Sequence, residues 1–65
     1  MEILTWQARR LRQMTLVRLA ALTDISKSTL NNIENGKASP TLDELEAIAK
    51  ALDFKITDLF DSAYK

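Results

Sequence analysis

The only glycine and the only proline of this 65-residue chain, Gly36 and Pro40, lie four positions apart, so the rest of the sequence has no strong chain breaker. Glycine and proline are the residues that most often interrupt helices and strands. Alternation of β-branched and polar residues, the pattern that predicts strands, is also scarce. The sequence therefore predicts an all-α fold with one irregular loop near the middle of the chain.

A chain of this length forms one domain at most, and we expect residues 1–65 to fold as a single unit. The sequence contains neither cysteine nor histidine, which excludes disulfides, thiolate chemistry and the commonest transition-metal ligands. No apolar run approaches the ~20 residues that cross a membrane, and no signal peptide is visible. These features predict a soluble cytoplasmic protein without a metal, a cofactor or a small-molecule ligand.

Apolar residues at helical spacing, bounded by capping residues, predict five short helices. Thr15 and Ser26 are good N-caps for the second and third helices. Thr41 and Glu44 form a capping box that opens the fourth helix. Gly36 follows the third helix, where a left-handed residue commonly ends a helix. The expected helices cover residues 4–13, 16–22, 27–34 and 42–52, and a short last helix holds Ile56, Leu59 and Phe60.

The apolar positions also predict which side chains form the core. In the first helix, Leu4, Ala8 and Leu11 fall on one stripe, which is expected to be buried. A lone tryptophan in a small domain is more often core than ligand platform, so Trp6 is expected to pack inside. In the fourth helix the inward positions are Leu42, Leu45, Ile48, Ala49 and Leu52.

The third helix is unusual because short amides and hydroxyls occupy its outer face. Ser28, Thr29, Asn31 and Asn32 are mediocre helix formers, which together cost on the order of 2 kcal/mol relative to alanine. Such side chains suit DNA bases, because asparagine can pair two-fold with adenine and hydroxyls can donate or accept at many base edges. An ordinary solvated face can have the same composition, so the helix alone leaves both interpretations open.

The chain carries no net charge, but its charges are unevenly distributed. Residues 1–37 hold six basic and three acidic residues (6 − 3 = +3), whereas residues 38–65 hold three basic and six acidic residues (3 − 6 = −3). This asymmetry is one sign of a side that faces a polyanion, although ordinary solvated charge also produces it. Arg10 and Arg12 are expected to be solvated or to contribute only at a distance.

Three segments, LAALTDISKSTLNNIENGKASP, LDELEAIAKALDF and ITDLF, resemble the lambda-repressor/Cro-like, or XRE, family of helix-turn-helix domains. The resemblance spans roughly residues 5–60. It implies a compact five-helix bundle in which helices two and three form the helix-turn-helix, and the third helix enters the major groove of DNA. Members of the family are usually transcription regulators, often dimeric on near-palindromic operators.

The resemblance also implies contacts for individual residues. The base-reading positions of the family fall on Lys27, Ser28 and Asn32, with Thr29 and Asn31 beside them. The phosphate-contacting positions fall on Thr15, Leu16, Asn35, Lys37 and Ser39. The internal ion pair of the family, which joins the first helix to the end of the third, falls on Arg9 and Glu34.

Three positions depart from the family pattern. Leu16 stands where a glutamine commonly touches phosphate, so that contact must be absent or replaced by the Thr15 hydroxyl, a backbone N–H or Arg18. Asp24 replaces the glycine of the turn, which implies a modest backbone strain. Lys55 replaces the serine that usually caps the last helix, which predicts fraying of that helix.

The expected function is sequence-specific binding of double-stranded DNA by a dimer that represses transcription from a near-palindromic operator. The expected dimer surface is the last helix with its tail, namely Ile56, Leu59, Phe60 and Tyr64. The first three of these residues could equally close the core instead. An antitoxin or restriction-system controller with a protein partner remains an alternative, as does a helical adaptor whose third helix faces a protein. An enzyme is not expected, because the chain has no glycine-rich phosphate loop and no convergent carboxylate pair.

Overall fold

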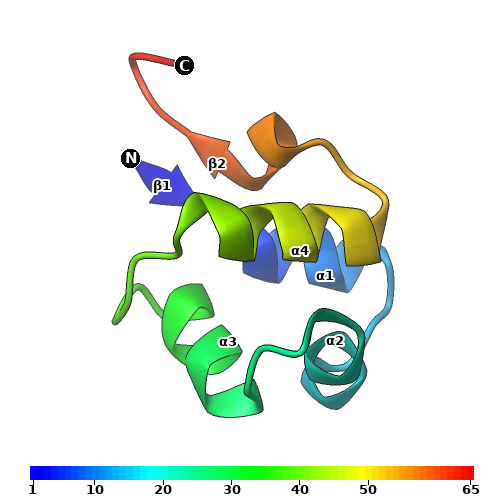
Figure 1. The fold of residues 1–65 in the computed structure, drawn as a ribbon. Coiled ribbons are helices and arrows are strands. Elements are labelled where there is room, and N and C mark those ends of the chain that lie inside the picture. The colour runs from blue at the N-terminus through cyan, green and yellow to red at the C-terminus, as the bar shows by residue number, and fades with distance from the viewer.

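The computed structural model describes residues 1–65 and consists of four α-helices, one 3-10 helix and a two-stranded sheet (Figure 1). The helices and strands, in chain order, are β1 (Glu2–Ile3), α1 (Thr5–Leu11), α2 (Leu16–Thr23), α3 (Lys27–Glu34), α4 (Leu42–Leu52), η1 (Ile56–Leu59) and β2 (Phe60–Asp61). None of the helices has both the length and the apolarity that crossing a membrane requires. The helical helix-turn-helix fold predicted from the sequence is confirmed in its four α-helices, whereas the expected fifth helix and the purely α composition are not.

The prediction of a fifth α-helix is wrong. Residues 56–59 form a short 3-10 helix, after which Phe60 adopts extended dihedrals (φ −152°, ψ 158°) and enters β2. The Lys55 side chain makes no capping hydrogen bond, and the start of η1 is held by Asp58, whose Oδ2 accepts the Lys55 N–H at 3.0 Å. Because nucleating an α-helix is unfavourable until several turns follow, so short a segment does not extend into one.

A small antiparallel sheet, which the sequence did not predict, joins the two ends of the chain. The register pairs Glu2 with Asp61 and Ile3 with Phe60. The same register continues past the strands, since the Leu4 N–H donates to the carbonyl oxygen of the residue before Phe60 at 2.8 Å. Strands of two residues are too short to show the alternating pattern that identifies a strand in a sequence.

The starts of α2, α3 and α4 have the capping chemistry that the sequence predicts. The Thr15 hydroxyl accepts the Arg18 N–H at 3.1 Å, and the Ser26 hydroxyl accepts an N–H in the first turn of α3 at 3.1 Å. In the capping box, the Thr41 N–H donates to Glu44 Oε1 at 2.8 Å, and the Glu44 N–H donates to the Thr41 hydroxyl at 3.0 Å. Local side-chain chemistry therefore determines where these helices begin.

Left-handed residues mark the ends of several helices. Asp24 (φ 59°) lies in the turn between α2 and α3, and Gly36 (φ 75°) follows α3, as predicted. Gln13 (φ 55°) and Asp53 (φ 58°) were not predicted to be left-handed. Gln13 lies beyond the end of α1, which stops at residue 11 rather than at residue 13 as expected.

The core is formed by buried side chains from all four α-helices and η1, namely Ala8, Leu19, Leu30, Leu45, Ile48, Ala49, Leu52 and Leu59. Three burial predictions are wrong, since Leu11, Leu42 and Trp6 are 73%, 74% and 45% exposed. Leu11 ends α1 and Leu42 begins α4, so both side chains lie beyond the part of their helix that is packed. Trp6 lies on the outer side of α1, where the Arg10 guanidinium carbon is 5.2 Å from its ring centroid.

Arg12 is exposed, as predicted, but it also joins the end of α1 to the end of α4, a structural role that the sequence did not predict. Its Nε donates to the Leu52 carbonyl at 2.8 Å, and its Nη2 donates to the Asp53 carbonyl at 3.1 Å. The guanidinium carbon also lies 4.1 Å from the centroid of the Phe54 ring. The last carbonyls of a helix lack intrahelical partners and carry partial negative charge, so a guanidinium group at this place stabilises the end of α4.

We expect Arg12→Met to lower the free energy of unfolding by about 1–2 kcal/mol, because two carbonyls lose a charged donor while the apolar stem is retained. Urea denaturation followed by circular dichroism measures this change. Arg18→Ala is the control, since the exposed Arg18 side chain makes no hydrogen bond, and should change stability by no more than about 0.5 kcal/mol. Equal losses in the two variants would contradict a stabilising role for Arg12.

Candidate DNA-binding surface

The second and third helices form a helix-turn-helix on one side of the domain, and the terminal sheet lies on the other (Figure 1). α2 and α3 pack against each other across the turn that contains Asp24. Leu30 and Ile33 are buried on the inner side of α3, with 1% and 2% of their surface exposed. The remaining positions of α3 therefore form a face that is directed away from the core.

Most side chains predicted to read bases lie on this outer face without internal partners. Lys27, Ser28 and Asn31 are exposed, and Asn32 is half-buried. None of these four side chains makes a hydrogen bond within the protein. Thr29 differs, because it is half-buried and its hydroxyl is 2.8 Å from the Ser26 hydroxyl. Four of the five predicted positions thus have free hydrogen-bonding capacity, whereas Thr29 belongs to the cap of α3.

The residues predicted to contact phosphate are at the start of α2 and in the α3–α4 loop. Asn35, Lys37 and Ser39 are all exposed in that loop. At the start of α2, Thr15 and Arg18 are exposed, whereas the Leu16 side chain packs against the core. Only the backbone N–H of residue 16 is therefore suited to a phosphate, because its side chain faces inward.

The loop after α3 is held by a backbone carbonyl. The Asn32 carbonyl accepts the Lys37 N–H at 2.8 Å and the Ala38 N–H at 3.2 Å. These bonds fix the loop that carries Lys37 relative to α3. The sequence did not predict this role of Asn32, because every residue has a backbone carbonyl and the residue type does not indicate which one will accept a hydrogen bond.

Arg9 and Glu34 lie together and join α1 to the end of α3. Arg9 Nε donates to Glu34 Oε2 at 2.7 Å, and Nη2 donates to Oε1 at 3.1 Å. Arg9 Nη1 also donates to the Met14 carbonyl at 2.8 Å, which anchors the segment before α2. The side chains are 12% and 4% exposed, so this bidentate pair is largely removed from water. One guanidinium group therefore connects three segments of the domain.

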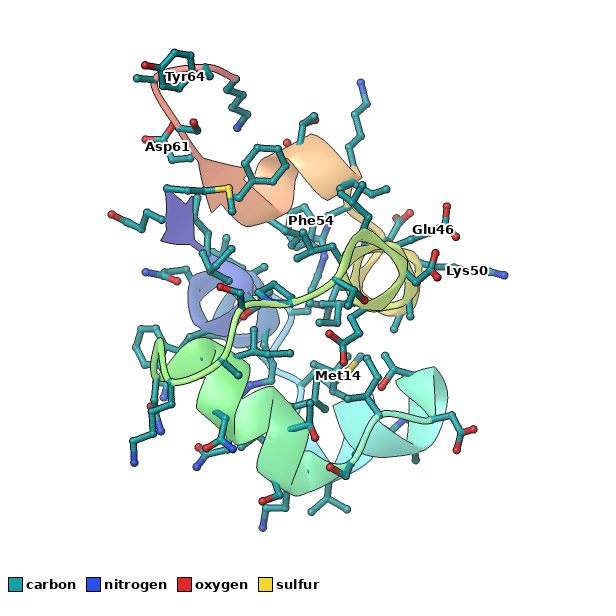
Figure 2. All side chains as sticks on the ribbon, turned by 60° about the vertical axis from the view of Figure 1, so that its left-hand side comes forward. Met14, Glu46, Lys50, Phe54, Asp61 and Tyr64 are labelled. Atoms are coloured by element: carbon teal, nitrogen blue, oxygen red, sulfur yellow. The ribbon has the colours of Figure 1, made fainter.

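The four residues predicted to form a dimer surface differ in their exposure. Leu59 is fully buried, so its prediction as an interface residue is wrong and the side chain closes the core instead. Ile56 and Phe60 are half-buried and also pack against the core. Tyr64 is 97% exposed, and Figure 2 shows it at the outer end of the tail.

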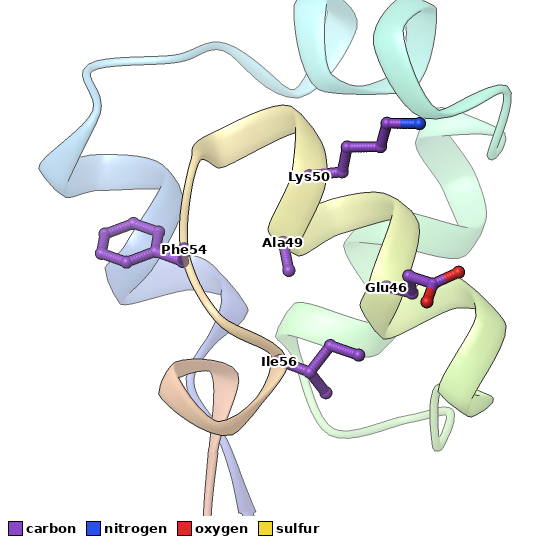
Figure 3. Close-up of a pocket in the computed structure, with 5 residues that line it drawn as sticks. All are labelled: Glu46, Ala49, Lys50, Phe54 and Ile56. Carbon is purple, nitrogen blue, oxygen red and sulfur yellow. The ribbon is translucent and has the colours of Figure 1, made fainter.

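The largest hollow in the surface lies away from α3. It has a volume of about 470 Å³ and is lined by Glu46, Ala49, Lys50, Phe54 and Ile56, between α4 and the segment that leads into η1 (Figure 3). Three of its five lining residues are hydrophobic, and the other two, Glu46 and Lys50, both belong to α4. No group of three or more Asp or Glu side chains gathers closely enough to hold a metal ion. The helix-turn-helix face therefore remains the candidate site.

Comparison with known proteins agrees with this geometry. The family model HTH_3, described as helix-turn-helix, matches residues 7–59. The chain belongs to this XRE-type helix-turn-helix family, as the sequence resemblance predicted. It is similar to a crystal structure of an HTH_3 family transcriptional regulator from Vibrio cholerae, with 36% identity and a TM-score of 0.76. The match covers 82% of this chain but only 30% of that regulator. No curated protein matches the chain.

We expect Arg9→Ala to lower the free energy of unfolding by about 3–5 kcal/mol, because it leaves the Glu34 carboxylate buried without its partner. Domains of this size have a total stability of only about 3–10 kcal/mol, so the variant should be close to unfolded at room temperature. Thermal denaturation followed by circular dichroism measures the effect.

The double variant Arg9→Met with Glu34→Leu is the control, since it removes both charges and keeps similar volume. It should be clearly more stable than Arg9→Ala, because neither charge is left unpaired. A double variant that is as unstable as the single variant would contradict the role given to the buried charge.

Proposed function

We propose that this domain binds double-stranded DNA through α3 and regulates transcription, with repression as the mode of action. The observation that supports this most directly is the free hydrogen-bonding capacity of Lys27, Ser28, Asn31 and Asn32 on the outer face of α3. This helix is the second of a helix-turn-helix, the element that enters the major groove in such units. The likeness to a transcriptional regulator from Vibrio cholerae supports the same function.

The chemistry of α3 suits base edges. Asn31 and Asn32 each carry an amide that can bond adenine N6 and N7 together, and Lys27 can donate to guanine O6 and N7 or to a phosphate. Ser28 can donate or accept, so it tolerates several bases. The free N–H groups at the start of α3 carry partial positive charge and favour a nearby phosphate. We infer that short polar residues occupy this helix because they read DNA, at the expense of helix propensity.

The phosphate contacts proposed for the loop and for α2 orient α3 on the duplex. Lys37 provides a cation next to the end of α3, and Asn35 and Ser39 provide neutral donors on either side. At α2, the free backbone N–H groups, the Thr15 hydroxyl and Arg18 can replace the glutamine contact of the family. Such contacts carry no sequence information, but they supply much of the affinity.

A single domain with this few phosphate contacts should bind DNA weakly, and a homodimer on a near-palindromic site would double the contacts. We therefore propose a dimer that represses by covering promoter DNA. Tyr64 and the exposed parts of Ile56 and Phe60 remain candidates for its interface, whereas Leu59 does not. A protein partner, as in antitoxins and restriction-system controllers, is compatible with the same DNA surface.

Salt dependence distinguishes DNA binding from an adaptor function. For duplex binding, the logarithm of the association constant should fall linearly with the logarithm of salt concentration, because each phosphate contact releases counterions. We expect Lys37→Ala to weaken binding to all duplexes alike and to reduce the slope by about one. Fluorescence anisotropy with labelled duplexes at several salt concentrations measures both quantities.

Lys55→Ala is the matched control, since it removes an exposed lysine that precedes η1 and lies outside the helix-turn-helix (Figure 1 shows the arrangement of the helices). Its slope should equal that of the unaltered protein. No binding even at low salt would favour the adaptor, and an unchanged slope in Lys37→Ala would remove Lys37 from the phosphate contacts.

Base reading is tested by Asn32→Ala on a site selected from random duplexes with the purified protein. We expect this change to cost about 1–3 kcal/mol on the best site and to relax the preference at one base pair. The fold should persist, because the Asn32 carbonyl that holds the loop is retained. Equal weakening on selected and unrelated duplexes would mean that Asn32 does not read bases. The symmetry of the selected site also reports whether a dimer binds.

A further inference from the structure

The two edges of the terminal sheet differ in their free backbone groups. The Leu4 N–H donates to the Leu59 carbonyl, and the register of the sheet makes Ile3 and Phe60 the next pair outward. Hydrogen-bonded and non-hydrogen-bonded pairs alternate along an antiparallel ladder, so Ile3 and Phe60 form a non-hydrogen-bonded pair. The N–H and C=O of Ile3 therefore point away from β2, and those of Phe60 point away from β1.

The outer edge of β2 is protected by the C-terminal tail. Lys65 Nζ donates to the Phe60 carbonyl at 2.9 Å and lies 5.4 Å from the centroid of the Phe60 ring. Lysine side chains are a common means of blocking an edge strand against further pairing. The outer edge of β1 has no such protection, because the sheet contains only these two strands. Of the two edges, β1 alone presents an unpaired N–H and C=O.

A cleft of about 380 Å³ runs along the open edge of β1. Met1, Glu2 and Ile3 form one wall, and the other consists of residues from the end of α3 and the following loop: Ile33, Glu34, Asn35, Gly36, Ala38 and Ser39. No residue of β2 lines the cleft, which places it on the unpaired side of β1. Figure 1 shows β1 and this loop on the same flank of the domain.

We propose that this cleft binds an extended segment of another protein, which adds to β1 as a third strand. An exposed strand edge pairs with an extended backbone, and pockets beside the edge then select alternate side chains. Ile3 and Ala38, which are both half-buried, supply the apolar surface on which an aliphatic side chain of the bound segment would pack, whereas the buried Ile33 adds little to it. The cleft thus combines backbone pairing with an apolar contact.

Two other occupants fit less well. A second copy of the domain would have to insert its own β1, which is attached to β2 on one side and faced by its own loop on the other. The domain's own tail is held at the opposite edge of the sheet by Lys65. Because a loop bounds the far side of the cleft, a free extended peptide can enter it more readily than the sheet of a second folded domain can.

The charges of the cleft indicate the chemistry of the segment. Its two acidic residues differ, because Glu34 is paired with Arg9 whereas Glu2 is exposed and forms no salt bridge. No Lys or Arg side chain lines the cleft. A segment with alternating aliphatic and basic side chains therefore matches the apolar surface and the free carboxylate of Glu2.

The probe is a panel of acetylated, amidated and fluorescein-labelled seven-residue peptides based on Thr-Val-Lys-Val-Lys-Val-Thr, with the central valine varied among Val, Ile, Leu and Phe. Fluorescence polarisation without DNA measures binding, so the test is independent of the proposed DNA binding. We expect saturable binding below 1 mM for at least one peptide, on the order of the weak end of specific recognition. Replacing both lysines of the peptide by glutamate should lower its affinity about threefold or more, as expected for one exposed charge contact.

Ile3→Pro is the decisive variant, because it removes the outward N–H without removing a donor of the β1–β2 pairing, and proline is tolerated at such edge positions. We expect a loss of affinity of about tenfold or more from the lost strand pairing, whereas Ile3→Val, which retains the N–H, should change it less than about twofold. Circular dichroism confirms that both variants are folded. Amide NMR shifts at Ile3 and Ala38 should report the bound peptide in the unaltered protein.

Three outcomes would overturn the proposal. The first is the absence of binding by every peptide of the panel, and the second is full binding by Ile3→Pro. The third is a dimer in sedimentation measurements that Ile3→Pro abolishes and Ile3→Val does not, which would assign the edge to a second copy. Tighter binding of the glutamate peptides would overturn the preference for a basic segment.

Discussion

The position of α3 depends on the guanidinium group of Arg9. This group binds both carboxylate oxygens of Glu34 and the Met14 carbonyl, so the end of α3 and the start of α2 are oriented from α1. α3 has only eight residues, many of them poor helix formers, and isolated helices of that length are unstable in water. The helix therefore exists because its inner face packs and its end is anchored. Because packing and the anchor stabilise α3, the residues on its outer face do not have to be good helix formers.

The parts of the fold that follow from local chemistry could be predicted from the sequence. The caps at Thr15, Ser26 and Thr41 were predictable because their partners lie within three residues. The terminal sheet was not, because its pairs join opposite ends of the chain through two-residue strands. Arg12 was misjudged for a related reason, since its partners are backbone carbonyls 40 and 41 residues away.

The candidate site was predictable to a similar degree. The polar residue types of α3 and the family resemblance together indicate the DNA-facing helix, and the structure adds that the Thr29 hydroxyl is paired with Ser26. The dimer surface was harder to predict from the sequence, because apolar residues near a chain end can belong either to the core or to an interface. Leu59 belongs to the core, and the sequence could not distinguish the two roles, since η1 is oriented by contacts with α1 and α4.

The pairing of the two chain ends has a mechanical consequence. Because Glu2 pairs with Asp61, both strands leave the domain at the same end of the sheet. A pull between the two ends would load the backbone hydrogen bonds one after another, as in unzipping, rather than all together in shear. The sheet would open at low force, before the core between α2 and α4 is disturbed. A polypeptide attached at either end can thus move or be pulled while the helix-turn-helix keeps its shape.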